Sequence, residues 1–289
     1  DKINNLFSKN FVLVPSLPQN FSDFHVNIKN LIEKYNLGDL NYIIHFGGAK
    51  GLMNNGIHYL DTSLKFINSE LVETVGFIDT ANIDAEILLS ISLKKSRGKI
   101  LLNLEDKLNK DQINEYLGLI NRRNTYEPIS LMIGRKFFWK NEFYVNKNVL
   151  TPRFETELLI EEVLKIYKHS ENISVIDIGL GTGCILISLL KEKKKWRGTG
   201  VEVSNLALRL AKTNAKIQQV YNRIKFINSD IDKFYFGKYD LIVTNPPYIN
   251  NIDYNNLNSG VKNFEPKMAL YGGRDGLDII EKVIRKSKL

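Results

Sequence analysis

The feature that most constrains the fold is the stretch DLIVTNPPYI at residues 240–249. Its apolar run at residues 241–243 predicts a short strand buried on both faces. Pro246 and Pro247 remove two backbone donors and fix φ, so the strand must end there in a rigid, extended corner. Open α/β sheets bind their ligands at the carboxyl ends of such strands. The stretch therefore predicts an α/β sheet with a functional corner.

The residues of this corner suit the recognition of a planar NH₂ group. Asn245 offers a side-chain carbonyl and Pro246 a backbone carbonyl, and both can accept hydrogen bonds. Tyr248 offers a flat face on which an amide or a base can stack. Such groups would hold a weakly nucleophilic nitrogen in line with an electrophile. The alternative is a proline-rich turn that caps a strand. The candidate catalytic residues are Asn245, Pro246, Pro247 and Tyr248.

Three further predicted strands precede this corner and carry a possible cofactor site. The strand at 173–178 runs into the glycine loop GLGTG at 179–183 and then a helix. The strand at 200–203 carries an acid that can bind both hydroxyls of a ribose, and an adenine could lie after the strand at 224–227. This order is that of an S-adenosylmethionine methyltransferase. The candidate cofactor-binding residues are Asp177, Gly179, Leu180, Gly181, Thr182, Gly183, Glu202, Asp230, Ile231 and Asn245.

Each of these signals also has an ordinary explanation. A GxGxG loop is not specific by itself, Glu202 could be a surface acid and Asp230 an ordinary turn residue. Their joint occurrence in this order favours the cofactor site.

The first half of the chain gives weaker signals. Residues 11–14 and 42–46 have strand patterns, and the glycines of 47–51 indicate a plain turn, because they lack the spacing of a phosphate loop. From residue 60 the pattern becomes helical, with Leu64, Ile67 and Leu71 on one face and further helices at 83–93 and 109–123. Such a bundle is either a packing domain or a surface that recognises a macromolecule. Residues 136–139 and 142–145 then predict a β-hairpin.

Composition excludes several classes of protein. Cys184 is the single cysteine, so an internal disulfide is impossible and a reducing, cytoplasmic location is expected. The four histidines are isolated, so no zinc spacing is present and no metal is predicted. No apolar run approaches the length of a transmembrane helix. The net charge of +8 is compatible with an RNA-rich or acidic partner, but the lysines are scattered.

Several stretches together resemble the release-factor glutamine methyltransferases, the HemK/PrmC family, from about residue 60 to the end. Residues 82–89 and 122–129 are similar to its helical domain, and 138–139 with VLTPRFETE at 149–157 to its hairpin and linker. The glycine loop, NPPY and the segment FEPKMALYGGRDGL at 264–277 complete the resemblance.

The resemblance implies a class I S-adenosylmethionine methyltransferase fold, Rossmann-like α/β, preceded by a small helical domain and a β-hairpin linker. The domains expected are an N-terminal extension of unknown role at 1–57, a helical substrate-recognition domain at 58–135, the linker at 136–150 and the methyltransferase domain at 151–289.

The activity implied is N5-methylation of the glutamine side chain in the GGQ motif of peptide-chain release factors, with S-adenosyl-L-methionine as the cofactor and a monomeric enzyme. On this resemblance the glycines lie against the cofactor's methionine and ribose, Glu202 holds the ribose, Ile231 lies beside the adenine, and residues 245–248 hold the glutamine amide.

Two alternatives to this activity stay open. One is a methyltransferase for adenine N6 or guanine N2 of DNA or RNA, since those enzymes share NPPY. The other is a non-catalytic remnant that binds only cofactor or partner. The remnant is considered because the family continues with further strands after the helix expected at 276–286, whereas this chain stops at Leu289. We therefore expect a sheet of order 3-2-1-4 whose fourth strand is an uncovered edge, in a truncated or damaged product.

Overall fold

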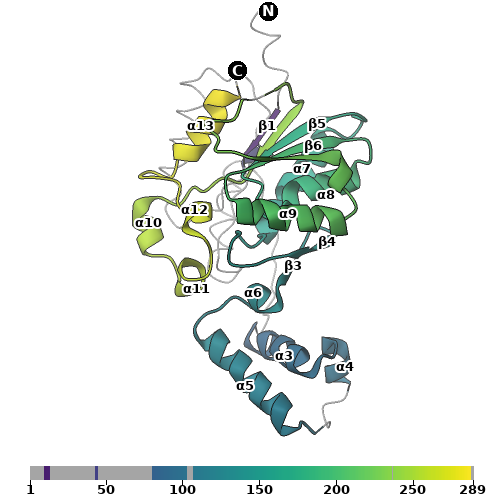
Figure 1. The fold of residues 1–289 in the computed structure, drawn as a ribbon, viewed down its shortest axis with the longest axis vertical. Helices are drawn as coiled ribbons and strands as arrows, with labels where there is room; N and C mark the ends of the chain where they lie inside the picture. Colours follow the sequence, from purple (N-terminus) through teal and green to yellow (C-terminus); the bar gives the residue numbers. More distant parts are fainter. Residues whose placement is uncertain (1–9, 14–42, 45–79, 103–106, 236, 288–289) are drawn as a thin grey trace, which may run out of the picture.

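The computed structural model describes residues 10–13, 43–44, 80–102, 107–235 and 237–287. The expected helix around Leu64–Leu71 and the glycine turn at 47–51 lie outside these residues. Figure 1 shows a layered α/β part at one end of the molecule and helices α3 to α5 at the other, with the hairpin between them.

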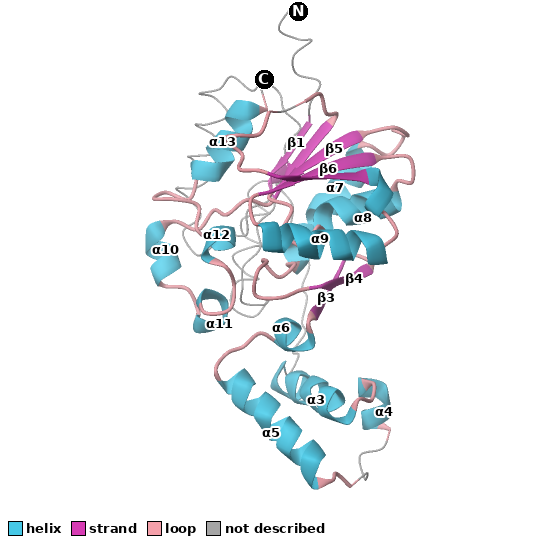
Figure 2. Cartoon of the chain, in the orientation of Figure 1, coloured by secondary structure: helices cyan, strands magenta, loops and turns pink. Residues whose placement is uncertain are grey.

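The four strands predicted around the cofactor site are neighbours in one six-stranded sheet. They are β5 (Ser174–Ile178), β6 (Arg197–Glu202), β7 (Ile224–Asn228) and β8 (Leu241–Thr244). They are parallel and their order is β8-β5-β6-β7, which confirms the predicted order 3-2-1-4. Figure 2 shows them side by side.

The expectation that the fourth strand is an uncovered edge is wrong. β1 (Asn10–Leu13) pairs with β8 in parallel register, Leu13 opposite Thr244, and β2 (Ile43–Ile44) pairs with β1. The backbone donors and acceptors of an edge strand attract any extended segment that can reach them. Here β1 supplies that pairing to β8. It comes from the first part of the chain, where residues 11–14 have a strand pattern.

Helices cover both faces of this sheet because successive residues of a strand point to opposite sides. Val175 packs in a cluster with α7 (Glu157–Ile166), α8 (Cys184–Glu192) and α9 (Asn205–Ile217). Its neighbour Ile176 packs in a second cluster with Val283 of α13 (Asp278–Lys286). The result is a three-layer sandwich with one apolar cluster on each face of the sheet.

The helices before the hairpin are α3 (Thr80–Leu93), α4 (Arg97–Leu101), α5 (Lys110–Asn124) and α6 (Ile129–Ile133). Asn109, the first residue of the helix predicted at 109–123, is the N-cap of α5 and forms a capping box with Gln112. An ion pair of 2.9 Å between Arg123 and Asp84 joins α5 to α3.

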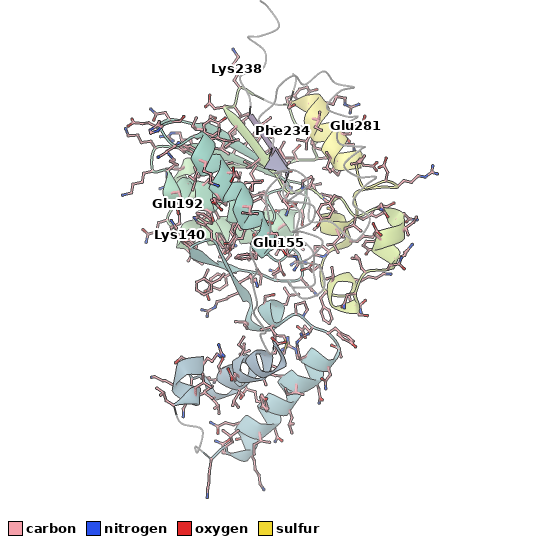
Figure 3. All side chains as sticks on the ribbon, turned by 180° about the vertical axis from the view of Figure 1, so that it is seen from behind. Lys140, Glu155, Glu192, Phe234, Lys238 and Glu281 are labelled. Carbon is pink, nitrogen blue, oxygen red and sulfur yellow. The ribbon has the colours of Figure 1, made fainter. Side chains whose placement is uncertain are left out.

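The hairpin strands β3 (Arg135–Phe138) and β4 (Asn141–Tyr144) are antiparallel, as predicted. Trp139 Nε1 and Lys140 Nζ both bind Glu192 Oε1 of α8 at 2.7 Å; the side chains of Lys140 and Glu192 are labelled in Figure 3. Three short helices follow β8, namely α10 (Asn251–Asn255), α11 (Ser259–Lys262) and α12 (Lys267–Leu270). Within the described ranges, no helix is long and apolar enough to cross a membrane.

Candidate active site

A cavity of about 290 Å³, called the site cavity below, lies where strands β5 to β8 end. Gly179 follows β5, Glu202 ends β6, Ser229 follows β7 and Asn245 follows β8, and all four line it. Parallel strands bring their carboxyl ends to one edge of the sheet, which explains how residues more than sixty positions apart meet. Its volume is close to the lower end of the range for small-molecule pockets, roughly 300–1,000 Å³.

Asn245 places an unpartnered carbonyl at this cavity. The strand before it is fixed at its end, since the Thr244 hydroxyl donates to the Ile178 carbonyl over 2.6 Å. Asn245 Nδ2 donates to Thr156 Oγ1 over 3.5 Å, whereas its Oδ1 is buried with no hydrogen-bond partner among the described residues. A buried carbonyl without a donor costs about 1–3 kcal/mol. The site is therefore ready for a ligand N–H.

The glycine loop lines the cavity with backbone. Gly179 and Gly181 have φ values of +77° and +55°, which side-chain-bearing residues rarely adopt. A Cβ at Gly179 would meet no protein atom within 4 Å, so the space above the loop is open to a ligand. Leu180 and Thr182 also line the cavity. Gly183 does not line it; this glycine is the N-cap of α8 and packs against Ile187.

Glu202 is buried at the end of β6, with 8% of its surface exposed. Its Oε2 accepts the Gly181 N–H at 2.8 Å and its Oε1 accepts the Ser204 N–H at 2.9 Å. Each carboxylate oxygen can accept a second hydrogen bond. The acid can thus hold the glycine loop and still accept the hydroxyls of a ribose.

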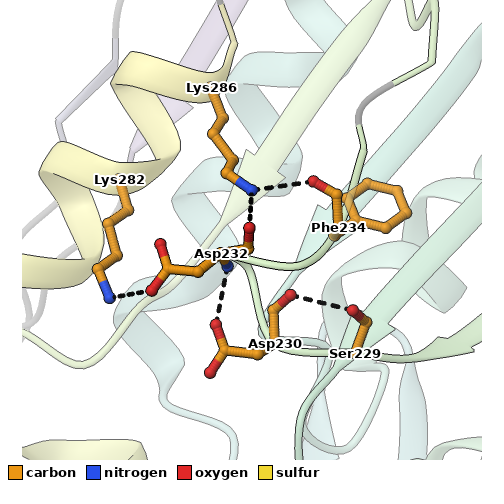
Figure 4. Close-up of polar contacts among 6 residues, drawn as sticks. All are labelled: Ser229, Asp230, Asp232, Phe234, Lys282 and Lys286. Atoms are coloured by element: carbon orange, nitrogen blue, oxygen red, sulfur yellow. Dashed lines mark hydrogen bonds and ion pairs between the residues drawn. The ribbon is translucent and has the colours of Figure 1, made fainter.

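Asp230 and Ile231 line the same cavity from the loop after β7. Helix α13 holds this loop in place (Figure 4): Lys282 forms an ion pair with Asp232, and Lys286 donates to the carbonyls of Asp232 and Phe234 at 2.7 and 3.0 Å. Ile231 is 8% exposed and packs in the apolar cluster that α13 covers. The loop therefore offers an apolar surface beside a carboxylate.

Asp177, like Gly183, is a predicted cofactor residue that does not line the cavity. It is fully buried in β5, and neither carboxylate oxygen has a hydrogen bond of ordinary geometry in the described part of the chain. Burial raises the pKa of Asp177 well above 3.8; the nearby backbone N–H of Leu186 opposes the rise and the charge of Glu202 adds to it. Asp177 is therefore a buried residue of β5 that does not face the cavity.

The NPPY corner is divided between cavity and core. Asn245 and Pro247 line the cavity, whereas Pro246 and Tyr248 do not, and Tyr248 is only 9% exposed. The segment after α12 packs against this corner: a Cβ on Gly272 would lie 2.5 Å from the Pro247 carbonyl oxygen. The glycines of residues 272–276 thus shape the backbone of the corner.

Two segments that sequence reasoning assigned no site role complete the cavity. Residues of the stretch 147–156 and of the segment 266–269 line it. Arg153 Nη2 binds Glu265 Oε2 at 2.6 Å and joins them. The sequence contains one indication of this role, because both stretches belong to motifs that carry the family resemblance. Only the contact between Arg153 and Glu265, which are 112 positions apart, shows that the two stretches meet. The further lining residues are Ile178, Cys184, Ile185, Val201, Val203, Ser204, Ala207 and Ile279.

Cys184 at the cavity is not a nucleophile. Burial raises the pKa of its thiol to about 12, while the side chain of Thr182 opposes the rise. The thiol therefore stays protonated at neutral pH and serves as a small apolar lining group.

Comparison with known proteins bears on both parts of the chain. Residues 64–134 match the family model "PrmC N-terminal domain" and residues 154–259 match "Methyltransferase small domain". The release factor glutamine methyltransferase of Caulobacter vibrioides is 38% identical over 201 residues, which cover 69% of this chain and 70% of that protein. The enzyme of the same name from Buchnera aphidicola is 36% identical, with coverage of 78% and 79%.

Proposed function

This chain belongs to the release factor glutamine methyltransferase family, and we propose that it methylates the N5 amide nitrogen of the glutamine in the GGQ motif of peptide-chain release factors. It is an S-adenosylmethionine-dependent methyltransferase. The substrate comes from the resemblance to the named relatives, and the chemistry of the site supports it.

One observation carries the proposal: Asn245 Oδ1 is buried, unpartnered among the described residues, and belongs to a residue that lines the site cavity. A primary amide carries two N–H groups, and one of them would satisfy this oxygen. Pro246 does not itself line the cavity, and on the family resemblance we assign its backbone carbonyl, with no N–H of its own beside it, as the second acceptor of the amide. Two acceptors fix both the position and the plane of the glutamine amide.

The residues present fit the cofactor. We assign the methionine and ribose portions to residues 179–182, the ribose hydroxyls to Glu202 and the adenine to the loop with Asp230 and Ile231. The open space above Gly179 and the free acceptor capacity of Glu202 support this placement. When bound, S-adenosylmethionine supplies an electrophilic methyl group on its sulfonium.

The chain's contribution to the reaction is orientation. An amide nitrogen is a poor nucleophile because its lone pair is conjugated with the carbonyl. Asn245 and Pro246 would hold the amide so that its nitrogen faces the methyl group that bound S-adenosylmethionine would supply. The nitrogen becomes acidic as it is methylated, and its proton leaves to water. A strong general base is therefore not required.

Recognition of the whole release factor is assigned to helices α3 to α6. Ile113 and Leu117 lie one helical turn apart on α5 and are 41% and 52% exposed. Contiguous exposed apolar surface marks sites of protein interaction, and we assign this pair to the contact with the release factor.

The test is methyl transfer from radiolabelled S-adenosylmethionine to a purified release factor, beside the same factor with Gln→Ala in its GGQ motif and beside nucleic acid. We expect label on the release factor and none on the Gln→Ala control. Label on DNA or RNA instead would establish the exocyclic-amine alternative. Cofactor binding without label on any acceptor would support the non-catalytic alternative.

A further inference from the structure

The proposed role of Asn245 raises a question of orientation. An asparagine side chain can turn by half a rotation about its terminal bond and exchange Oδ1 with Nδ2. Only one of the two orientations presents an acceptor to the substrate amide, and the other presents a donor to a donor. A residue outside the NPPY motif must therefore select the orientation.

Thr156 is placed to make this selection. Its Oγ1 accepts from Asn245 Nδ2 over 3.5 Å, and its side chain is buried, with 2% of the residue exposed. Hydrogen bonds at an active site are often long before the substrate binds. With Nδ2 turned toward Thr156, Oδ1 is the atom left without a partner among the residues described at the cavity.

A buried ion pair holds Thr156 in turn. Thr156 belongs to the 3₁₀ turn η2 (Phe154–Thr156), and its N–H donates to the Arg153 carbonyl over 3.0 Å. The Arg153 guanidinium binds Glu265, whose side chain is 1% exposed. Charge-assisted hydrogen bonds between buried groups are short and geometrically strict. The pair therefore fixes the turn against the segment that follows the NPPY corner.

We propose that Thr156 is a positioning residue that sets the amide orientation of Asn245, and that the Arg153–Glu265 pair keeps Thr156 within reach. The inference rests on the proposed function, because it assigns Oδ1 to the substrate amide. The chain of contacts runs from Glu265 through Arg153 and Thr156 to Asn245. The groups assigned to the cofactor lie on other elements, at residues 179–182, Glu202 and the loop after β7.

The deciding experiment compares Thr156→Val with Thr156→Ser. Valine keeps the volume and removes the acceptor, whereas serine keeps the hydroxyl. We expect the valine variant to lose about tenfold in kcat, the equivalent of one hydrogen bond. We expect its Kd for S-adenosylhomocysteine, from calorimetry, to stay within about threefold of wild type. The serine variant should keep kcat within about threefold, since its oxygen can still accept.

Glu265→Gln tests whether the Arg153–Glu265 pair keeps Thr156 within reach of Asn245. Glutamine removes the negative charge of the side chain and preserves its shape. The kcat of this variant should fall while cofactor affinity holds, and Arg153→Lys serves as a second variant if Glu265→Gln unfolds in a thermal melt. Wild-type kcat in Thr156→Val, equal losses in the valine and serine variants, or a loss of cofactor affinity in step with kcat would each overturn the inference. If the wild-type enzyme labels no release factor, the proposed function fails and the inference falls with it.

Discussion

The Gly181 backbone N–H donates to Glu202 Oε2 over 2.8 Å, so the acid at the end of β6 also holds the glycine loop after β5. The same carboxylate binds the Ser204 N–H with its other oxygen. Glu202 thereby joins the ends of β5 and β6. Its contact with the glycine loop depends on the length of its side chain, which a substitution can test.

Glu202→Asp removes one methylene and moves the carboxylate back from Gly181. We expect the Kd for S-adenosylhomocysteine to rise about tenfold, since one loop contact is lost and the loop is freer to move. Isothermal titration calorimetry measures the change. Glu171→Asp is the matched control, because Glu171 is an exposed acid paired with Lys195. Unchanged affinity in Glu202→Asp would mean that the acid serves the ribose alone.

Asn245→Ala should abolish methyl transfer and spare the cofactor. Removing a preorganised group at the reacting atoms costs about 10²–10³ in kcat, while the glycine loop and Glu202 are untouched. We expect the Kd for S-adenosylhomocysteine to stay within about threefold. Asn256→Ala, at an exposed asparagine, is the control. Near-wild-type methylation by Asn245→Ala would refute the assignment of the corner.

Gly276→Ala should destabilise the protein and deform the corner. Gly276 has a φ of +84°, and a Cβ there would lie 2.2 Å from the Tyr248 carbonyl oxygen. We expect a loss of about 1–3 kcal/mol in the free energy of unfolding. Gly118→Ala is the matched control: its Cβ meets nothing within 4 Å inside α5, so it should stabilise by about 0.4–1 kcal/mol. Urea denaturation measures the change in the free energy of unfolding for both variants. Equal changes in the two variants would contradict the backbone strain expected at Gly276.

Asp177→Asn should change how stability depends on pH. The raised pKa means that the folded state holds the proton more tightly than the unfolded state does, so stability falls as pH rises from about 3.8 through the folded pKa. Asparagine removes this titration. We expect a higher melting temperature than wild type at pH 7 and a difference that shrinks toward pH 4.

The control for Asp177→Asn is Asp232→Asn. The hydrogen bond from Lys282 lowers the pKa of Asp232. Ionisation of this exposed acid therefore stabilises the folded state, whereas ionisation of Asp177 destabilises it. The Asp232→Asn variant should gain no stability at pH 7. A parallel shift of both variants in pH-dependent thermal melts would contradict the role given to burial.

The double substitution of Ile113 and Leu117 by serine should weaken recognition of the substrate protein. We expect KM for the intact release factor to rise about tenfold, because two apolar contacts would be lost. The rate with a short GGQ peptide should not change, since the site cavity is untouched. Ile217→Ser, at an exposed apolar residue of α9 outside helices α3 to α6, is the control. A loss on peptide and protein alike would place the defect elsewhere.

The sequence by itself determined the central sheet and the positions of its strand ends. Buried apolar runs, the glycine loop and the proline corner are local signals, and they located four strands and most of the cavity-lining candidates, from Gly179 to Asn245, whereas the expected strand order came from the family resemblance. The same signals identified Asp177 as a candidate, but they could not show that its side chain is buried away from the cavity. That depends on how the helices pack against the strand.

Only the tertiary structure decided which distant segments meet the corner. The pairing of β1 with β8, the ion pair of Arg153 with Glu265, and the contact of Thr156 with Asn245 join residues separated by 89 to more than 200 positions. No local pattern encodes such contacts, since each segment alone reads as an ordinary strand, linker or turn. Their positions follow from the burial of unpaired backbone and charged groups, which find their partners only when the chain has folded.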